Sequence, residues 1–539
     1  MPPPKFRILV TDDIDAEGVG LLSADDRLVV DEVPTLPREE VLARIGEYDA
    51  LIGRSATKIS TELLERGTRL RVIGRAGVGV DNIAMDSATE LGIAVINAPA
   101  GNTIAVAELV FGTLIGLLRN IPRATESMRA GRWDRADFLG SELKGRTLGI
   151  VGVGRIGSEV AVRAHAFGMS VVGYDPYIPE ERFRALRVRS APSLDALLDD
   201  SDIVTVHTPL TAETKGMIGA AELARLKPGG VVANIARGGI IDETALLEAL
   251  DRGHLAGAVL DVYAAEPLAK DHPLRAAANV VLTPHIGAST AEAQRNVAVD
   301  VCRGVRDALV TGELSRSINV EWPGEGHWAE LRPTIGLTDR AATLARALLA
   351  DRGVRAVRRL SIRVGPELIG AGQLLLSAAA VGCLRGVLET DRLNLINARS
   401  LAEARGIELG VAEHADARHP TLIEVSIGGA AHEVVVAGVA TSGAPPRITR
   451  IGQFHVDVAP RQTLIVLGNN DVPGVIGRVG TMLGNAGVNI AEYHQARLGG
   501  AQGGEALAAI SVDGETPADL RHRLLELPDV LSASVVRFV

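Results

Sequence analysis

The feature that most constrains the fold is the glycine-rich segment V-G-V-G-R-I-G at residues 151–157. It directly follows the apolar run Leu148 to Ile150, and a helical pattern after it leads to a second apolar run that ends before Asp175. A strand, a glycine turn, a helix and an acid after the next strand form the pattern of a dinucleotide-binding βαβ unit. We therefore expect an open α/β fold with a parallel sheet.

Each glycine of this turn has a physical task in such a unit. Gly152 permits the tight turn, Gly154 lets the backbone approach a pyrophosphate, and Gly157 lets the helix pack closely against the strand. The phosphates would then lie on exposed N–H groups at the helix N-terminus. The carboxylate of Asp175 can accept hydrogen bonds from a ribose diol and would repel a 2′-phosphate. The sequence therefore predicts NAD rather than NADP as the cofactor.

Composition narrows the class of protein further. The chain has 539 residues and is 47% hydrophobic, which is enough for several cores. Its net charge of −10, with no basic block, argues against nucleic acid or an anionic membrane as the main partner. Cys302 and Cys383 lie far apart in apolar, helix-like contexts, which favours buried thiols in a reducing cytosol. No set of His, Cys or acidic residues has metal-ligand spacing, so we expect no metal.

The chain also lacks the features of a membrane or secreted protein. Its N-terminus moves straight into a strand-like run, without the apolar core and cleavage site of a signal peptide. The apolar stretch Ile104–Leu118 is interrupted by Glu108 and is too short to span a bilayer, so we expect a buried helix there. These observations predict a cytoplasmic protein.

The alternation of apolar runs and helical patterns predicts how the chain is divided. Residues 1–97 form the first part of a substrate-binding lobe, and residues 98–286 form a Rossmann lobe that is inserted into it. Residues 287–317 then return to the first lobe. Residues 318–459, where period-two alternation takes over, form an intervening α+β domain. Residues 460–539 read βαββαβ, which is a ferredoxin-like order.

Three polar residues stand where a nucleotide lobe places its chemistry, at the carboxyl ends of predicted strands. A hydride can leave a secondary alcohol only if the hydroxyl proton leaves too, and histidine is the natural base for that proton. His285 is the candidate base, and Glu266 is the carboxylate that would orient its ring. Arg237 would clamp the substrate carboxylate with two hydrogen bonds and polarise the carbonyl in the reverse reaction.

Motifs along nearly the whole chain resemble one family, the D-isomer-specific 2-hydroxyacid dehydrogenases, and within it the long forms that end in an ACT domain. The motifs that carry this resemblance, besides the glycine turn, are G-R-S-A-T-K at 53–58, G-R-A-G-V-G-V-D-N at 74–82, V-H-T-P-L at 206–210, A-R-G-G at 236–239 and P-H-I-G-A-S-T at 284–290.

The resemblance implies roles for further residues. It places Arg237, Glu266 and His285 in the catalytic trio, and Arg54 and Arg75 on an acidic substrate, with Asn102 near the same cleft. It implies that Arg135, in the segment 131–135, completes the pocket of a partner subunit. The residues that it implies around NAD, in addition to the glycines, are Arg155, Ile156, Asp175, Thr208, Ala236, Asp261, Gly287 and Ala288.

The resemblance also implies an activity and its control. It points to NAD-dependent oxidation of 3-phospho-D-glycerate to 3-phosphohydroxypyruvate, the first step of L-serine biosynthesis, in a homo-oligomer (a dimer or tetramer). The segments N-N-D-V-P-G at 469–474 and G-V-N-I at 487–490 resemble an ACT domain that binds the effector L-serine. The implied effector residues are Asn469, Asp471 and Asn489, although an aromatic or imidazole side chain often stands at the position of Asn469.

Two other functions remain as alternatives. One is a related dehydrogenase that acts on glyoxylate, hydroxypyruvate or formate; these subfamilies lack a typical ACT tail, and the formate enzymes carry Gln at the position of Glu266. The other, from a different class, is an NAD-sensing interaction protein like the dehydrogenase-related corepressors. Those proteins retain the catalytic trio but lack the two C-terminal domains expected here.

Overall fold

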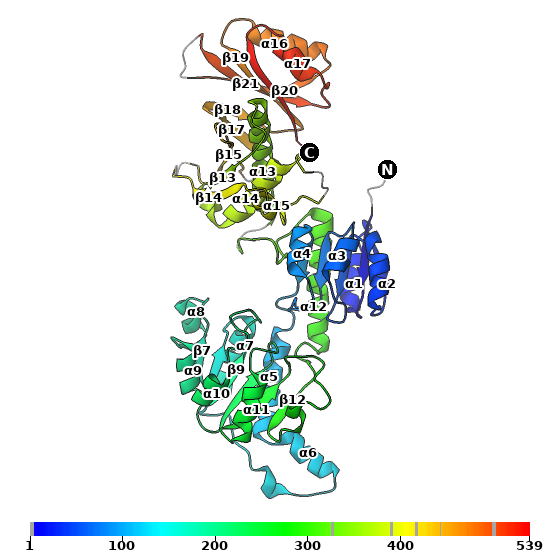
Figure 1. Cartoon of the computed structure of the whole chain (residues 1–539), viewed down its shortest axis with the longest axis vertical. Helices are drawn as coiled ribbons and strands as arrows, with labels where there is room; N and C mark the ends of the chain where they lie inside the picture. Colours follow the sequence, from blue (N-terminus) through cyan, green and yellow to red (C-terminus); the bar gives the residue numbers. More distant parts are fainter. Residues whose placement is uncertain are drawn as a thin grey trace.

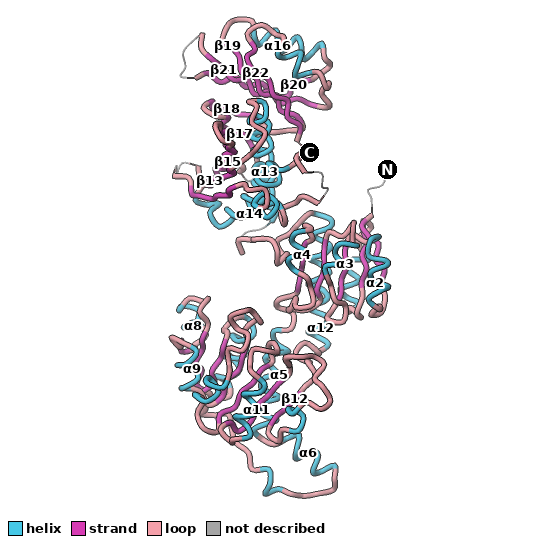
Figure 2. The backbone as a smooth tube through the Cα atoms, in the orientation of Figure 1, coloured by secondary structure: helices cyan, strands magenta, loops and turns pink. Residues whose placement is uncertain are grey.

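Four separate sheets follow one another along the computed structural model, which describes residues 5–324, 328–388, 392–415, 419–441, 443–498 and 503–538 (Figure 1). The first two sheets are entirely parallel and belong to two lobes joined by α5 (Thr103–Leu118) and α12 (Ala291–Thr311). The last two sheets belong to the C-terminal half. Figure 2 shows the strands of the two lobes as layers between helices.

The first lobe has a five-stranded sheet in the order β2-β1-β3-β4-β5. Leu9, Leu51 and Ile73 pack against helices on one face, while Ile8 and Ile52 pack against α12 and α1 on the other, as the two-residue period of a strand requires. Its elements are β1 (Phe6–Val10), α1 (Ala16–Ser23), β2 (Leu28–Glu32), α2 (Arg38–Arg44), the 3₁₀ turn η1 (Ile45–Glu47), β3 (Ala50–Gly53), α3 (Thr61–Arg66), β4 (Val72–Arg75), α4 (Met85–Glu90) and β5 (Ala94–Asn97).

The second lobe has a seven-stranded sheet in the order β12-β11-β10-β9-β6-β7-β8. Strand β6 lies between β7 and β9, so the chain reverses its direction of travel across the sheet at the end of β6. Ligands bind at such a switch point in open α/β sheets. Its elements are β6 (Thr147–Val151), α7 (Arg155–Ala166), β7 (Ser170–Tyr174), α8 (Glu180–Ala185), β8 (Arg189–Ser190), α9 (Leu194–Asp200), β9 (Ile203–Val206), α10 (Ala220–Arg225), β10 (Gly230–Asn234), α11 (Glu243–Asp251), β11 (Leu255–Leu260), the 3₁₀ turn η3 (Pro273–Ala276) and β12 (Val280–Leu282).

Side chains set the ends of several helices. The carboxylate of Asp242 accepts from the backbone N–H groups of Thr244 and Ala245 at 2.9 and 3.0 Å and so caps α11. Thr290 caps α12 in the same way, and Gly312, at φ 71°, ends that helix in the left-handed conformation. Helix α12 therefore starts at the cleft between the lobes and packs along α1 and β4 of the first lobe.

An arm leaves the second lobe between α5 and β6. It contains α6 (Ile121–Arg129) and the 3₁₀ turn η2 (Arg135–Phe138), and Figure 1 shows α6 at the far end of this lobe. Two of its large apolar side chains are strongly exposed, Trp133 at 74% and Leu139 at 92% of their possible area.

The intervening unit has a six-stranded sheet in the order β14-β13-β15-β16-β17-β18, covered by α13 and α14. Among the described residues, one helical stretch, Pro366–Leu384, is long and apolar enough to cross a membrane, as is the sharply bent pair α5 and α6 taken together. The first stretch is mostly buried against α13, as expected for a core helix. The elements are α13 (Trp328–Asp351), β13 (Arg359–Val364), the 3₁₀ turn η4 (Pro366–Ala371), α14 (Gly372–Leu384), α15 (Ala398–Glu403), β14 (Glu408–Glu413), β15 (Leu422–Gly428), β16 (Glu433–Val439), β17 (Arg447–Ile451) and β18 (Phe454–Val458).

The last unit has the predicted βαββαβ order, and its four strands are antiparallel in the order β20-β21-β19-β22. Its elements are β19 (Thr463–Asn470), α16 (Val475–Asn485), β20 (Asn489–Arg497), β21 (Glu505–Asp513), α17 (Leu520–Leu525) and β22 (Val530–Arg537). Val539, to which the sequence pattern extends the last strand, lies outside the described residues. The predicted fold class is confirmed: two parallel α/β lobes precede an α+β unit and a ferredoxin-like unit.

Candidate active site

The three predicted catalytic residues follow three neighbouring strands of the second lobe. Arg237 follows β10, Glu266 follows β11 and His285 follows β12. Because these strands are parallel and adjacent, their carboxyl ends lie at one edge of the sheet. The fold therefore brings the three side chains to the edge where ligands bind.

His285 and Glu266 form a hydrogen-bonded pair. The Nδ1 atom of His285 lies 2.7 Å from Oε2 of Glu266, while Oε1 of Glu266 accepts from the backbone N–H of Tyr263 at 3.1 Å. With Nδ1 donating to the carboxylate, the Nε2 atom of His285 is the nitrogen that accepts a proton. Both side chains are partly exposed, 49% for His285 and 36% for Glu266, so the pair is accessible from the cleft.

A buried carboxylate holds the loop that carries His285. Asp261 is 1% exposed and accepts from the hydroxyl of Thr283 at 2.6 Å and from the backbone N–H groups of Ile286 and Gly287 at 2.8 and 2.9 Å. His285 itself has a φ of 55°, in the left-handed region that is costly for most residues. The bonds to Asp261 on both sides of His285 stabilise that conformation.

Arg237 is held from both lobes. Its Nε donates to Oδ2 of Asp81 in the first lobe at 3.0 Å, and one terminal nitrogen donates to the carbonyl of Ala236 at 2.7 Å. Gly79 lies against the guanidinium so closely that a Cβ atom there would be 1.9 Å from its second terminal nitrogen. The loop 76–81 therefore shapes the position of Arg237.

Arg54 and Arg75 bring further positive charge to the same place. Burial, followed by the charges of Arg237 and Arg54, lowers the pKa of Arg75 to about 10. Arg75 donates from Nε to the amide oxygen of Asn82 at 3.1 Å, and the carboxylates of Asp12 and Asp81 offset only part of the repulsion among the guanidinium groups. Three crowded cations are a site for an anionic ligand.

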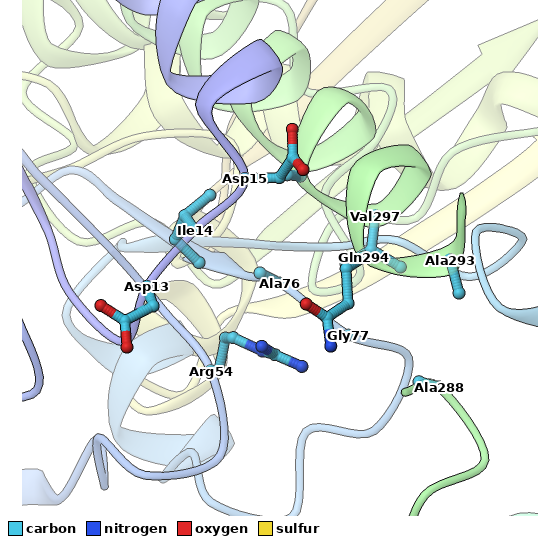
Figure 3. A pocket seen from close by; sticks show the side chains of 11 residues that line it. Asp13, Ile14, Asp15, Arg54, Ala76, Gly77, Ala288, Ala293, Gln294 and Val297 are labelled. Atoms are coloured by element: carbon cyan, nitrogen blue, oxygen red, sulfur yellow. The ribbon is translucent and has the colours of Figure 1, made fainter. Parts of the chain in front are cut away.

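Two hollows lie at the cleft. One, of about 780 Å³, is lined by His285 and Glu266 and also by Ser55 and Ala56 of the first lobe. The other is small, about 20 Å³, and Figure 3 shows Arg54 and the amide of Gln294 extending toward each other in it. Residues of both lobes therefore line the space beside the catalytic pair.

The glycine turn has the shape that a dinucleotide requires. Gly152 has a φ of 89°, and a Cβ atom there would lie 2.8 Å from the carbonyl of His207; one at Gly157 would lie 2.2 Å from the carbonyl of Gly152. A Cβ at Gly154 would meet open space. No side chain caps α7, whose N–H groups begin at this turn. The buried hydroxyl of Thr208, beside Gly152, has no hydrogen-bond partner among the described residues.

Asp175 lies at the end of β7, as predicted, and it also supports the turn. Its Oδ2 accepts from the backbone N–H of Val153 at 2.9 Å, and its Oδ1 accepts from that of Tyr177 at 3.0 Å. A carboxylate has lone pairs to spare for a ribose diol after these two bonds. Within the described residues, no group of three or more His, Cys, Asp or Glu has the arrangement of a metal site.

Known proteins are similar to this chain over nearly its whole length. Residues 111–287 match the model of the D-isomer specific 2-hydroxyacid dehydrogenase NAD binding domain. D-3-phosphoglycerate dehydrogenase of Synechocystis is 38% identical over 98% of this chain and 94% of its own length. Those of Archaeoglobus fulgidus (98% of this chain, 100% of its own length) and Mycobacterium tuberculosis (98% of each) are 35% and 36% identical.

The chain belongs to the D-3-phosphoglycerate dehydrogenase family. It is accordingly an oxidoreductase whose cofactor is NAD.

Solved structures match the two lobes. The TT0316 protein of Thermus thermophilus is 36% identical with a TM-score of 0.54, over 58% of this chain and 99% of that one. D-lactate dehydrogenase of Aquifex aeolicus, complexed with NAD and lactic acid, is 30% identical with a TM-score of 0.50, over 57% of this chain and 97% of that one. The two-lobed part of the chain thus has the fold of 2-hydroxyacid dehydrogenases.

Other residues that the family implies lie in different places. Ala236 follows β10, Arg155 and Ile156 begin α7, and Ala288 lines the small hollow with Arg54. The buried Oδ1 of Asn102, at the start of α5, has no partner among the described residues. Arg135 lies in the arm, and no contact joins it to the cleft of its own chain among the described residues.

The three implied effector residues do not meet within one chain of this family member. Asn469 pairs with Ala506 and Asn489 with Asp513, at opposite ends of strand β21. Asp471, near Asn469, is paired with Arg497 at 2.8 Å. Asn469 is 1% exposed, and its Oδ1 has no partner among the described residues. Asn469 and Asn489 are therefore too far apart along β21 for one small ligand to contact both within a single chain.

Sequence reasoning missed two contributors to the site, Asp81 and Gln294, and one role of a third residue that it did predict, Asp261. Asp81 is the partner of Arg237, Gln294 faces Arg54, and Asp261 holds the His285 loop as well as lying near the predicted cofactor site. Asp81 stands in the motif G-R-A-G-V-G-V-D-N, so its position in a cleft loop was a signal. Gln294 stands inside a helix pattern and gave none.

Proposed function

We propose that this enzyme oxidises 3-phospho-D-glycerate to 3-phosphohydroxypyruvate with NAD, by the trio Arg237, Glu266 and His285. The observation that carries the proposal is the His285–Glu266 pair, at 2.7 Å, in a cleft that also holds three arginines. The names of the relatives, which match over nearly the whole chain, support the same substrate.

The proposed substrate matches the charge of the cleft. It carries a carboxylate and a phosphate, so it needs more cations than Arg237 alone can supply. Arg54 and Arg75 supply them. Burial is the main cause of the lowered pKa of Arg75, and the repulsion from Arg237 and Arg54, which lowers it further, would be relieved when an anion binds. An unphosphorylated acid would leave part of this positive charge unpaired, which costs free energy in a partly buried site.

The reaction follows from the donors and acceptors in the cleft. Arg237 holds the substrate carboxylate and carbonyl-forming oxygen. Nε2 of His285 takes the hydroxyl proton, and Glu266 stabilises the imidazolium that forms by accepting from Nδ1. NAD, when bound, accepts the hydride. In the reverse direction His285 returns its proton to the oxygen, while Arg237 stabilises the developing charge.

Thr208, Asp175 and the glycine turn would hold the cofactor. The unpartnered hydroxyl of Thr208 and the open space over Gly154 support phosphate binding at α7, and the carboxylate of Asp175 supports the choice of a ribose diol. We assign the remaining predicted cofactor contacts to Arg155, Ile156, Ala236, Asp261, Gly287 and Ala288.

A second subunit completes the site in this proposal. The arm that carries Arg135 exposes Trp133 and Leu139, which supports burial of the arm in a homodimer. Arg135 would then enter the cleft of the partner. This can be tested with hybrid dimers of R135A and H285A chains, each inactive alone. Recovered activity in the hybrid supports a shared site, because one site then has both wild-type residues; hybrids as inactive as the parents contradict it.

Residues 1–97 and 287–317 would bind substrate, residues 98–286 would bind NAD, and residues 318–459 and 460–539 would regulate. L-Serine is the proposed effector, at Asn469 and Asp471 of one chain and Asn489 of another. The separation of these residues within one chain supports a site between two subunits. The proposed location is the cytoplasm, where both cysteines would stay as the buried thiols observed.

One assay tests the substrate. The purified chain, with NAD, should oxidise 3-phosphoglycerate with a kcat/KM at least about tenfold above those for glycerate and lactate, since losing one pairing of a buried charge costs more than about 1.4 kcal/mol. Replacing NAD with NADP should lower the rate. Equal rates with the unphosphorylated acids would overturn the assignment of substrate while leaving the dehydrogenase chemistry intact.

A further inference from the structure

Side chains of the intervening domain form hydrogen bonds to the turn at residues 90–92 of the substrate-binding lobe. In the segment before α15, Asn394 donates from Nδ2 to the carbonyl of Gly92 at 2.7 Å, and Asn397 donates from Nδ2 to the carbonyl of Glu90 at 3.3 Å. Arg392 donates to the carbonyl of Gly67 at 2.6 Å. Figure 1 shows α15 and α4 facing each other where the C-terminal half meets the first lobe. We name these contacts the asparagine clasp.

The asparagine clasp packs so closely against the turn that residue 92 has no room for a side chain. Gly92 is buried at a φ of 67°, and a Cβ atom there would lie 2.6 Å from Nδ2 of Asn394 and 2.8 Å from Nδ2 of Asn397. Asn397 is 2% exposed, and its Oδ1 accepts from the backbone N–H of Asn394 at 3.0 Å. A buried amide whose donor and acceptor are both satisfied, as those of Asn397 are, specifies one arrangement.

The same turn leads directly into β5, and β5 ends at the catalytic cleft. Asn97, the last residue of β5, donates from Nδ2 to the carbonyl of Val78 at 2.6 Å, and the N–H of Ala98 donates to the carbonyl of Gly77 at 3.0 Å. Val78 belongs to the loop 76–81, which presses Gly79 and Asp81 against Arg237. A movement of β5 along its axis would therefore displace the support of Arg237.

Strand β5 is suited to transmit such a movement. It has four residues and lies at the edge of its sheet, where it pairs in parallel with β4, which ends at Arg75, and is bridged on its other side from Ile96 to Ser317. Asn319, from the segment that leads to the intervening domain, also donates to the carbonyl of Ile93 at 2.9 Å and accepts from the N–H of Val95 at 3.0 Å. Two segments of the C-terminal half thus hold one end of β5.

We infer that β5 is the connection by which the intervening domain sets the position of loop 76–81 and hence of Arg237, with Asn394 as a positioning residue at its far end. The inference deepens the proposed function, because it names how the C-terminal half regulates the same site. It rests on an unbroken run of hydrogen bonds and backbone from Asn394 through Gly92 and Asn97 to Asp81.

The test uses the full chain with Asn394→Asp. This change keeps Oδ1, which accepts from the N–H of Ile396 at 2.9 Å, and replaces the donor to Gly92 by an oxygen that repels the carbonyl. The matched control is Gln373→Glu, the same change of charge at an exposed position of α14 in the same domain. Hydrogen exchange, measured by mass spectrometry, reports on peptides at 93–98 and 76–82 without any substrate.

In N394D, exchange should accelerate at least about threefold in both peptides, which corresponds to a loss of about 0.6 kcal/mol of local protection. The KM for 3-phosphoglycerate should rise at least about threefold, while the Kd for NADH stays within about twofold, because the glycine turn belongs to the other lobe. The control should match wild type in all three measurements.

Faster exchange confined to the turn before residue 94, or no change in exchange at all, would overturn the inference. Asn394→Ser, which removes the donor without adding charge, replaces N394D if that variant fails to fold, and the same outcomes decide it. Wild-type protein that shows no activity on phosphoglycerate would instead refute the proposed function, whereas the exchange result stands on its own. Loss of any L-serine response in N394D, with serine still bound by calorimetry, would support the connection further.

Discussion

Asp81 and Arg237 join the two lobes across the catalytic cleft, with Oδ2 of the carboxylate accepting from Nε of the guanidinium at 3.0 Å. The bond uses the edge of the guanidinium that does not face Ala236, and it fixes the plane in which the remaining donors lie. It also makes the geometry of Arg237 depend on the closure of the lobes, because each partner belongs to a different one.

Asp81→Asn should therefore lower kcat/KM for 3-phosphoglycerate by about two- to fivefold, because Asp81 is 63% exposed and an exposed ion pair contributes roughly 0.2–1 kcal/mol. The Kd for NADH should not change. Asp86→Asn, an exposed acid in the first turn of α4, is the matched control. Full activity in D81N would mean that Arg237 is positioned without its partner.

We expect substitutions of His285 and of Glu266 to reduce turnover to different extents. His285→Ala should abolish turnover while NADH still binds, because a general base contributes roughly 10²- to 10⁴-fold. Glu266→Gln keeps an acceptor for Nδ1 but removes the charge that stabilises the imidazolium, so kcat should fall less than in H285A. Steady-state rates and fluorescence titration with NADH measure both effects. Normal turnover in H285A would exclude its role as the base.

We expect substitution of Asp175 to change both the cofactor preference and the cofactor affinity. The sequence alone did not indicate the effect on affinity. Asp175→Ala should lower the preference for NAD over NADP, and it should also weaken both cofactors, because Oδ2 holds the N–H of Val153 in the glycine turn. Asp175→Asn keeps an acceptor for that N–H and removes only the charge. It should therefore relax the preference with a smaller loss of affinity. An unchanged NAD to NADP ratio of kcat/KM in both variants would contradict the ribose contact.

The sequence predicted those parts of the fold whose local pattern agrees with the tertiary structure. Hydrophobic periodicity and turn-forming residues predict three features: the glycine turn, helix α5 and the βαββαβ order of the last unit. All three are observed. Strands β8, β14 and β16 gave no usable pattern. β8 has two residues, β14 is an edge strand with little burial, and β16 is largely buried, so none of them shows a clean alternation.

The residues of the candidate site also fall into those that the sequence predicts and those that it does not. Residues at strand ends could be predicted, because a parallel sheet brings its carboxyl ends together whatever the loops do. Arg237, Glu266 and His285 are of this kind. Asp81 and Gln294 could not be assigned, because their roles depend on how the second lobe and α12 lie against the first lobe. Contacts such as Asn394 with Gly92 join segments about 300 positions apart, and no local pattern encodes them.

His207 predicts a pH-dependent stability that is separate from catalysis. Burial lowers the pKa of this imidazole to about 3, and its Nε2 lies 3.0 Å from the hydroxyl of Thr205. The ordinary pKa of histidine is about 6.5, so below that pH the unfolded chain binds a proton that the folded chain refuses. The folded state is therefore stabilised above pH 6.5, and this contribution is lost as the pH falls from 6.5 toward 3.

Two measurements check this prediction. In NMR spectra, the ring signal that disappears in His207→Gln should not shift between pH 8 and pH 5 in the wild-type protein. The free energy of unfolding of wild type relative to H207Q should decrease by up to about 1.4 kcal/mol per pH unit below pH 6.5. This slope corresponds to one extra proton bound by the unfolded chain. A ring signal that titrates near pH 6.5 would show that the imidazole is hydrated, and the two proteins would then lose stability in parallel.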